Sequence, residues 1–116
     1  DLPIATGAEP WTAYAGRVVR SLSALLTEHD GRRLLLVGHG KTIALACALL
    51  RGSPRPADDV VAFASDHGCL TRWQLRVDRD GFRGWSLIAH NDLSHLVTTS
   101  LAQRQGAQSP RRWSGR

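Results

Sequence analysis

The sequence predicts an α/β fold built on a mixed sheet. Its clearest signal is a short apolar run, Leu34–Val37, which leads through a glycine-flanked turn at residues 38–40 into an apolar helix. Such a run is typical of a buried parallel strand. Residues 69–77 and 82–89 follow, with alternating polarity on either side of an Asp-Gly turn, which is typical of an antiparallel hairpin. The sheet is therefore expected to be parallel around Leu34–Val37 and antiparallel at the hairpin.

An amphipathic helix is predicted ahead of the first strand. Pro10 stands near the first helical position, where proline is favoured, and Asp30-Gly31 is a stop signal. The apolar residues between them recur at helical spacing, so we expect them to pack in the core rather than to hold a cofactor. They are Trp11, Tyr14, Ala15, Val18, Leu22, Leu25 and Leu26.

The remaining elements follow the central turn. The apolar helix after it is expected to end at Gly52, before a proline-containing loop. A short apolar strand is predicted over residues 60–64, ahead of the hairpin. The polar residues at 90–92 are expected to break the second hairpin strand, and Ser94 is expected to cap a final helix over residues 94–103.

Size and charge set the domain organisation. The chain has 116 residues, which is enough for one domain, and its formal net charge is +5. Residues 104–116 carry four arginines and no acidic residue, whereas the rest is close to neutral. We expect residues 1–103 to form the domain and residues 104–116 to be a basic, disordered tail. The tail lacks interleaved aromatic residues apart from Trp113, which argues against nucleic acid as a partner.

Cysteine usage and hydropathy favour a cytoplasmic protein. Cys47 falls on the apolar helix and Cys69 in a predicted strand, without metal-ligand spacing, so both are expected to be reduced thiols. No apolar run approaches the length of a membrane span, and no signal peptide is apparent. Because the chain starts at Asp1 and contains no methionine, we expect it to be a fragment of a longer protein.

The turn at residues 38–40 is the leading candidate site. It places His39 at the carboxyl end of a strand and beside a helix N-terminus, whose free N–H groups and dipole favour an anion such as phosphate. A histidine there can donate a hydrogen bond to a phosphoryl oxygen or shuttle a proton. The alternative interpretation is that His39 is only a polar residue that ends the strand.

Two other loop motifs fit this turn poorly. A phosphate-binding loop of the form G-x-x-x-x-G-K-[ST] would use Gly40-Lys41-Thr42, but its first glycine position is Leu35, inside the strand. A hydrolase nucleophile elbow, G-x-S-x-G, would need serine where Gly40 stands. Neither a triphosphate cradle nor an acyl-enzyme is therefore expected.

The five histidines do not form a recognisable metal site. None pairs with another at i, i+4 on a helix, and no carboxylate cluster accompanies them, so neither a metal nor another cofactor is expected. His67 lies in a turn before a predicted strand and can reach the same sheet edge as His39, where ligands bind in α/β folds. The alternative is that His67 only supports its own turn.

Four segments, in this order, resemble the carboxyl-terminal half of the histidine phosphatase superfamily, also called phosphoglycerate mutase-like. They are the helix with Arg17-Val18 that leads to Gly31 and LLLVGHG, the next helix with its Leu-Leu-x-Gly end, DHGCLTRWQL, and HNDLSHL at residues 90–96. The last two are similar to the family's N-x-S-x-T-x-L strand and N-D-T-x-H-L ending. The resemblance covers about residues 9–96. It implies a three-layer-type mixed sheet with helices on both faces, incomplete at the N-terminus.

The resemblance also implies a phosphohistidine mechanism. The histidine of an R-H-G motif takes the phosphoryl group, and water or another hydroxyl then removes it. His39 would match the second pocket histidine and stabilise the phosphoryl group in transfer, while the Gly40 N–H binds the same oxygens. Lys41 would add positive charge to this pocket or else point to solvent. His67 stands where the family commonly has asparagine, and we expect it to bind phosphate as well.

Departures from the family pattern bear on activity. The R-H-G motif is absent, because His39 follows Gly38 and His67 follows Asp66, and the general acid of the family's middle region is missing too. The first sheet strand is also missing, which would leave the edge of Leu34–Val37 unpaired. The chain by itself is therefore expected to be inactive.

The function predicted for the complete protein is phosphoryl transfer through a phosphohistidine intermediate. Hydrolysis of a small-molecule phosphate monoester is favoured, and mutase activity stays open. The alternative is a truncated paralogue that binds phosphate or another protein without catalysis. Neither a membrane nor nucleic acid is an expected partner. The identity of the substrate and the oligomeric state, a homodimer included, stay open at this stage.

Overall fold

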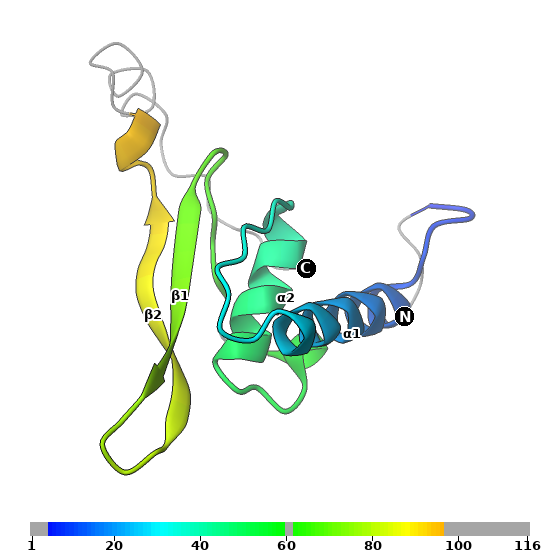
Figure 1. Ribbon diagram of the computed structural model, residues 1–116. Coiled ribbons are helices and arrows are strands. Elements are labelled where there is room, and N and C mark those ends of the chain that lie inside the picture. The colour runs from blue at the N-terminus through cyan, green and yellow to red at the C-terminus, as the bar shows by residue number, and fades with distance from the viewer. Residues whose placement is uncertain (1–4, 60–61, 97–116) are drawn as a thin grey trace. The chain divides into compact units, whose positions relative to one another are not determined.

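The computed structural model describes residues 5–59 and 62–96. The chain divides into two compact units, one up to Phe63 and one from Ala64 onward. The first unit contains α1 (Trp11–Glu28), α2 (Gly40–Leu50) and the short 3₁₀ helix η1 (Pro56–Asp58), and the second contains β1 (Leu70–Val77), β2 (Arg83–Asp92) and the 3₁₀ helix η2 (Ser94–Leu96) (Figure 1). Helices and a sheet are both present, as the α/β prediction requires.

The amphipathic stripe of α1 is confirmed. Ala15, Val18 and Leu22 are buried and cluster with Leu45 of α2. These side chains recur at helical spacing, so they lie on one face, and their burial stabilises the pairing of the two helices. At the end of α1, the His29 N–H donates to the Leu25 carbonyl oxygen over 3.0 Å.

The end of α2 also follows the prediction. Gly52 adopts the left-handed conformation, with φ of 84°, that a glycine reaches without steric cost. Its N–H donates to Leu49, and the Ser53 N–H donates to Ala48, which is the Schellman pattern of helix termination. Cys47 is buried within α2 and Cys69 is partly buried, and neither of the two forms a disulfide bond.

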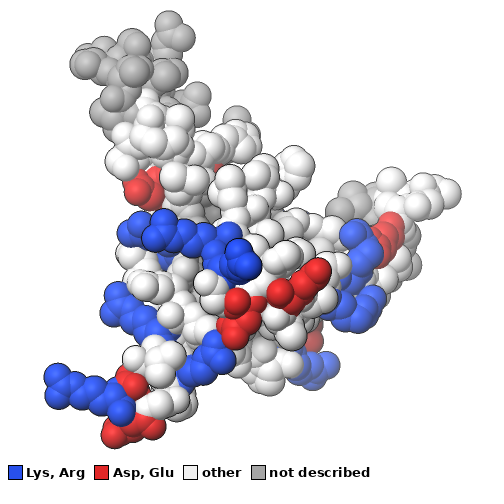
Figure 2. Space-filling model, in the orientation of Figure 1, with Lys and Arg blue, Asp and Glu red and all other residues white. Residues whose placement is uncertain are grey.

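Charged side chains of both signs are interspersed on the described surface. Figure 2 shows acidic side chains among basic ones on the face in view, rather than a broad surface of one sign. Arg17 pairs with Glu9 over 2.8 Å. Arg51 binds Asp59 with two guanidinium hydrogen bonds, and the Asp59 side chain is only 6% exposed. This pair ties the end of α2 to the loop after η1. The arginine-rich residues 104–116 lie outside the described part of the chain.

The prediction of a strand at Leu34–Val37 is wrong for this structure. No strand is assigned there, and the four residues are 38%, 82%, 50% and 92% exposed in order. The exposed fraction alternates along the segment, as it does along an extended backbone with one partly covered side. A parallel strand exists only when a neighbour takes up its backbone hydrogen bonds. Among the described residues the sheet consists of β1 and β2 alone, and segment 34–37 is not paired into it.

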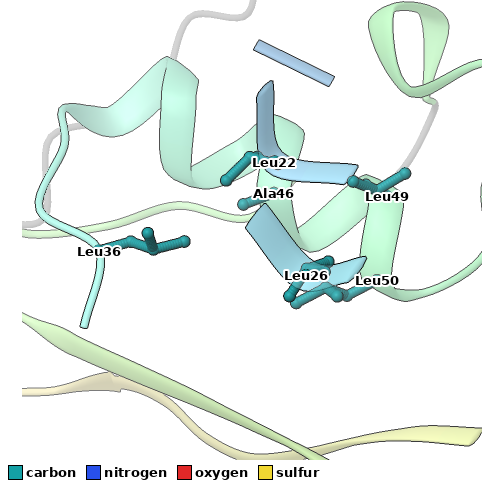
Figure 3. Close-up of a pocket in the computed structure, with 6 residues that line it drawn as sticks. All are labelled: Leu22, Leu26, Leu36, Ala46, Leu49 and Leu50. Carbon is teal, nitrogen blue, oxygen red and sulfur yellow. The ribbon is translucent and has the colours of Figure 1, made fainter. Parts of the chain in front are cut away.

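Leu36, one of the two less exposed residues of this segment, contributes to an apolar pocket. Leucines of both helices complete the lining, together with one alanine (Figure 3). The six lining residues are Leu22, Leu26, Leu36, Ala46, Leu49 and Leu50. The 34–37 segment therefore keeps one side toward the helices, as a strand of an α/β sheet would, while its other side is uncovered.

The predicted hairpin is confirmed, and its second strand is longer than expected. β1 and β2 are antiparallel, with Trp73 opposite Leu87 and Leu75 opposite Trp85. The prediction that residues 90–92 break β2 is wrong, because β2 runs to Asp92. Two register shifts, on either side of Arg72, absorb extra residues of β2 and let polar residues join the strand.

Two further predictions meet the edges of the described ranges. Residues 62–64 of the strand expected at 60–64 form no strand, and residues 60–61 lie outside the described residues. The helix expected over residues 94–103 starts as η2, and its residues 97–103 also lie outside them. Within the described parts, no helix is both long enough and apolar enough to cross a bilayer.

Candidate functional site

His39 is the residue at which the chain enters α2. It has extended backbone angles (φ −99°, ψ 169°), and its side chain makes no capping hydrogen bond. Its carbonyl oxygen accepts the Ile43 N–H over 3.0 Å and so closes the first turn of the helix. The N–H groups of that first turn have no partner within the helix. The imidazole and an anion-attracting helix terminus therefore lie at the same exposed place.

The two glycines beside His39 serve different purposes. A Cβ on Gly38 would lie 3.3 Å from the Cβ of Thr42, so a side chain there would crowd the first turn of α2. A Cβ on Gly40 would meet no atom within 4 Å. There is therefore open space beside the Gly40 backbone, at the N-terminus of α2.

α1 supports this helix terminus through Tyr14. The Tyr14 hydroxyl shares a short hydrogen bond with the Thr42 hydroxyl, in the first turn of α2. The guanidinium of Arg17 lies 5.3 Å from the centroid of the Tyr14 ring on the same helix. The hydrogen bond between Tyr14 and Thr42 links residues 28 positions apart, and it anchors the turn that carries His39.

Lys41 is held by an aromatic ring. Its Nζ lies 5.2 Å from the centroid of the Trp11 ring, within the range of a cation–π interaction. The Trp11 indole N–H donates to the Ala57 carbonyl oxygen over 3.2 Å, which fixes the ring. Trp11 and Tyr14 were predicted only as core residues. The two residues stand three positions apart on one face of α1, and this spacing is the signal in the sequence that both contact the start of α2.

His67 lies in the second unit, on an exposed turn ahead of β1. The Cys69 N–H donates to the Asp66 carbonyl oxygen over 3.3 Å, and Gly68 has φ of 75°. The predicted turn is confirmed, with glycine in the left-handed position that such a turn needs. His39 and His67 belong to different units, so their meeting at one phosphate stays a prediction.

Metal-ligating side chains are not grouped in the described ranges. No set of three or more His, Cys, Asp or Glu residues there is placed to hold a metal ion. The residues around the start of α2 provide hydrogen-bond donors: the imidazole of His39, the backbone N–H of Gly40 and the ammonium of Lys41. Such a donor set suits an anionic, oxygen-rich ligand.

The family model of the histidine phosphatase superfamily (branch 1) matches residues 2–92. The chain belongs to the histidine phosphatase superfamily. A search of curated proteins and a search of solved structures returned no match. Membership supports phosphatase- or mutase-like function at the level of the family, with a phosphate-ester small molecule as substrate, and it supports an α/β fold. The match spans both the His39 turn and the His67 turn.

Proposed function

We propose that these residues form part of a phosphoryl-transfer site, and that the reaction of the complete protein is phosphomonoester hydrolysis through a phosphohistidine intermediate, with mutase activity as the variant. The observation that carries this is the position of His39 at the exposed N-terminus of α2 in a histidine phosphatase chain. There the imidazole donates a hydrogen bond to a phosphoryl oxygen, and the first-turn N–H groups bind the oxygens beside it.

The other predicted residues have roles around this centre. Lys41 contributes positive charge from its position over Trp11, and His67 binds a further phosphoryl oxygen from its turn. Both assignments belong to this proposal. The uncovered side of the 34–37 segment supports the finer architecture, a three-layer mixed sheet with helices on both faces, in which a neighbouring strand pairs with this segment.

A second candidate is phosphate binding without turnover by the 116-residue chain itself. It is favoured by one observation: the sequence contains no Arg-His-Gly, so a histidine of the nucleophilic type is not among these residues. We propose that the chain alone binds phosphate and hydrolyses no aryl phosphate. Turnover of an aryl phosphate that the His39→Ala variant abolishes would contradict this.

The test is a titration of the chain with inorganic phosphate, followed by NMR of the histidine ring signals. The wild-type chain should show a saturable shift of the His39 ring signals. His39→Ala should weaken binding about tenfold or more, since it removes a charge-assisted hydrogen bond.

His29→Ala is the matched control. His29 lies in the same unit as His39 but at the carboxyl end of α1, so its replacement should leave the affinity for phosphate unchanged. Gly40→Ala tests the backbone contact, because its Cβ meets no atom within 4 Å in the structure and would crowd a phosphate bound at the start of α2 as proposed. Equal phosphate affinity in the wild-type and His39→Ala chains would exclude the proposed site.

A further inference from the structure

The turn that carries His67 has little of its own to hold it. Its four residues, Asp66 to Cys69, are closed by a single backbone hydrogen bond of 3.3 Å. Asp66, His67 and Gly68 are exposed. A ligand-binding histidine on such a turn needs a contact from elsewhere to keep its direction, because ordering it only on binding lowers the affinity.

Asn91 of β2 supplies that contact. Its side-chain oxygen accepts the backbone N–H of Asp66 over 2.9 Å. Its side-chain nitrogen donates to the Asp66 carboxylate, also over 2.9 Å. One amide group thus makes two hydrogen bonds to Asp66, one accepted and one donated, and together they fix the position and the rotation of this residue directly before His67.

The backbone of Asn91 is shaped for this contact. Asn91 has φ of 52°, the one left-handed non-glycine residue among those described, and asparagine tolerates this region better than most residues. Its own N–H donates to the Thr71 hydroxyl over 3.3 Å. It also lies in the register shift between the Leu70–Asp92 and Arg72–Ala89 pairs. Bulges of this kind turn a side chain away from the regular strand direction.

The chain after Asn91 contacts the other side of the turn. A Cβ on Gly68 would lie 3.1 Å from the Cδ1 atom of Leu96, so Leu96 packs directly against the turn backbone. Asp92 accepts the Ser94 N–H over 2.9 Å at the start of η2, the short helix that carries Leu96. Segment 91–96 therefore contacts the turn at Asp66 and again at Gly68.

We propose that Asn91 is a positioning residue for His67. By holding Asp66 it keeps the turn in the orientation that presents the His67 ring to a phosphoryl group. This inference rests on the proposed function for its ligand. The contact between Asn91 and Asp66 can be tested without that ligand.

The test compares a broken contact with an exchanged one in the 116-residue chain. Asn91→Ala removes both hydrogen bonds without adding charge. Asn91→Asp brings a second carboxylate against that of Asp66. The combined Asp66→Asn, Asn91→Asp variant exchanges donor and acceptor, so both bonds can form again with the net charge of the wild type. Gln74→Ala, on an exposed position of β1, is the matched control.

The readouts are the affinity for inorganic phosphate, the phosphate-induced shift of the His67 ring, and hydrogen exchange of the Asp66 N–H. Both single Asn91 variants should speed that exchange about fivefold or more and lose most of the His67 shift, consistent with one or two missing hydrogen bonds. The combined variant should restore all three readouts. If swapping the two side chains restores the readouts, a general loss of folding is excluded as the cause of the losses in the single variants.

Two outcomes overturn the proposal: a wild-type His67 shift and affinity in Asn91→Ala, or no recovery in the combined variant. A wild-type chain that binds no phosphate would refute the proposed function instead. In that case exchange of the Asp66 N–H and the side-chain rotamer populations of His67 decide the role of Asn91. They support it if Asn91→Ala changes both and the combined variant restores both, and they refute it otherwise.

Discussion

In the first unit, the helical unit with α1 and α2, His39 lies at the start of a helix that packs on a buried core. In the second unit, the hairpin unit with β1 and β2, His67 lies on a turn held by polar side chains. Among the described residues, the buried apolar side chains all belong to α1 and α2: Ala15, Val18, Leu22, Leu45, Cys47 and Ala48. None of the described residues from 64 to 96 reaches that degree of burial. The two candidate residues therefore depend on different forces, His39 on apolar burial beneath its helix and His67 on a few hydrogen bonds around its turn.

The largest expected effect is the loss of the core that supports α2. Leu45 is 2% exposed and packs against α1, so Leu45→Ala leaves a cavity and should lower the free energy of unfolding by about 2–5 kcal/mol. Hydrogen exchange of the α1 and α2 amides should accelerate accordingly, while that of the hairpin amides stays unchanged. Leu87→Ala on β2 is the control, because Leu87 is 42% exposed and leaves no comparable cavity. Equal acceleration of hydrogen exchange in both units would show that the hairpin depends on the same apolar core as the helices.

A smaller effect is expected at the contact between α1 and the first turn of α2. Tyr14→Phe keeps the ring beneath Arg17 and removes the hydrogen bond to Thr42. The free energy of unfolding, measured in urea, should fall by about 0.5–1.5 kcal/mol.

Thr42→Val, measured alone and together with Tyr14→Phe, completes a double-mutant cycle. If the hydrogen bond carries the effect, the combined variant should lose less than the sum of the two single losses. Strictly additive losses would show that the two hydroxyls do not stabilise one another.

The smallest expected effect is a pH dependence confined to the hairpin unit. The backbone hydrogen bond from Ser94 lowers the pKa of Asp92 below its ordinary value. Because the folded carboxyl holds its proton less tightly than the unfolded one, its stabilising contribution is complete above the ordinary pKa and is lost as the pH falls through the lowered one. Thermal unfolding between about pH 5 and about pH 2 should therefore be less pH-dependent in Asp92→Asn. Identical slopes in the two chains would show that this bond contributes nothing to stability.

Regular patterns in the sequence predict the regular elements well. The 3.6-residue stripe of α1, the glycine that ends α2 and the alternation of β1 all depend on neighbours within a few positions of one another. The place of His39 at a helix start follows from the same local signals, since a glycine-flanked turn and an apolar run suffice to mark it.

Two of the wrong predictions concern pairing between distant segments. Leu34–Val37 has the composition of a buried strand, but a strand also needs hydrogen bonds from a neighbour that no local pattern specifies. Residues 90–92 look like a strand break, yet register shifts opposite β1 accommodate them within β2. In both cases the partner segment decided the outcome.

The residue pattern was sufficient to predict the order of the family motifs, the two main helices, the hairpin, and the candidates His39, Gly40, Lys41 and His67. What holds these candidates in place became visible only in the folded chain. Tyr14 bonds to Thr42 across 28 positions of the chain, and Asn91 bonds to Asp66 across 25. Helical and strand periods describe residues only a few positions apart. Contacts of this range therefore emerge only when the elements have packed and directed their side chains toward one another.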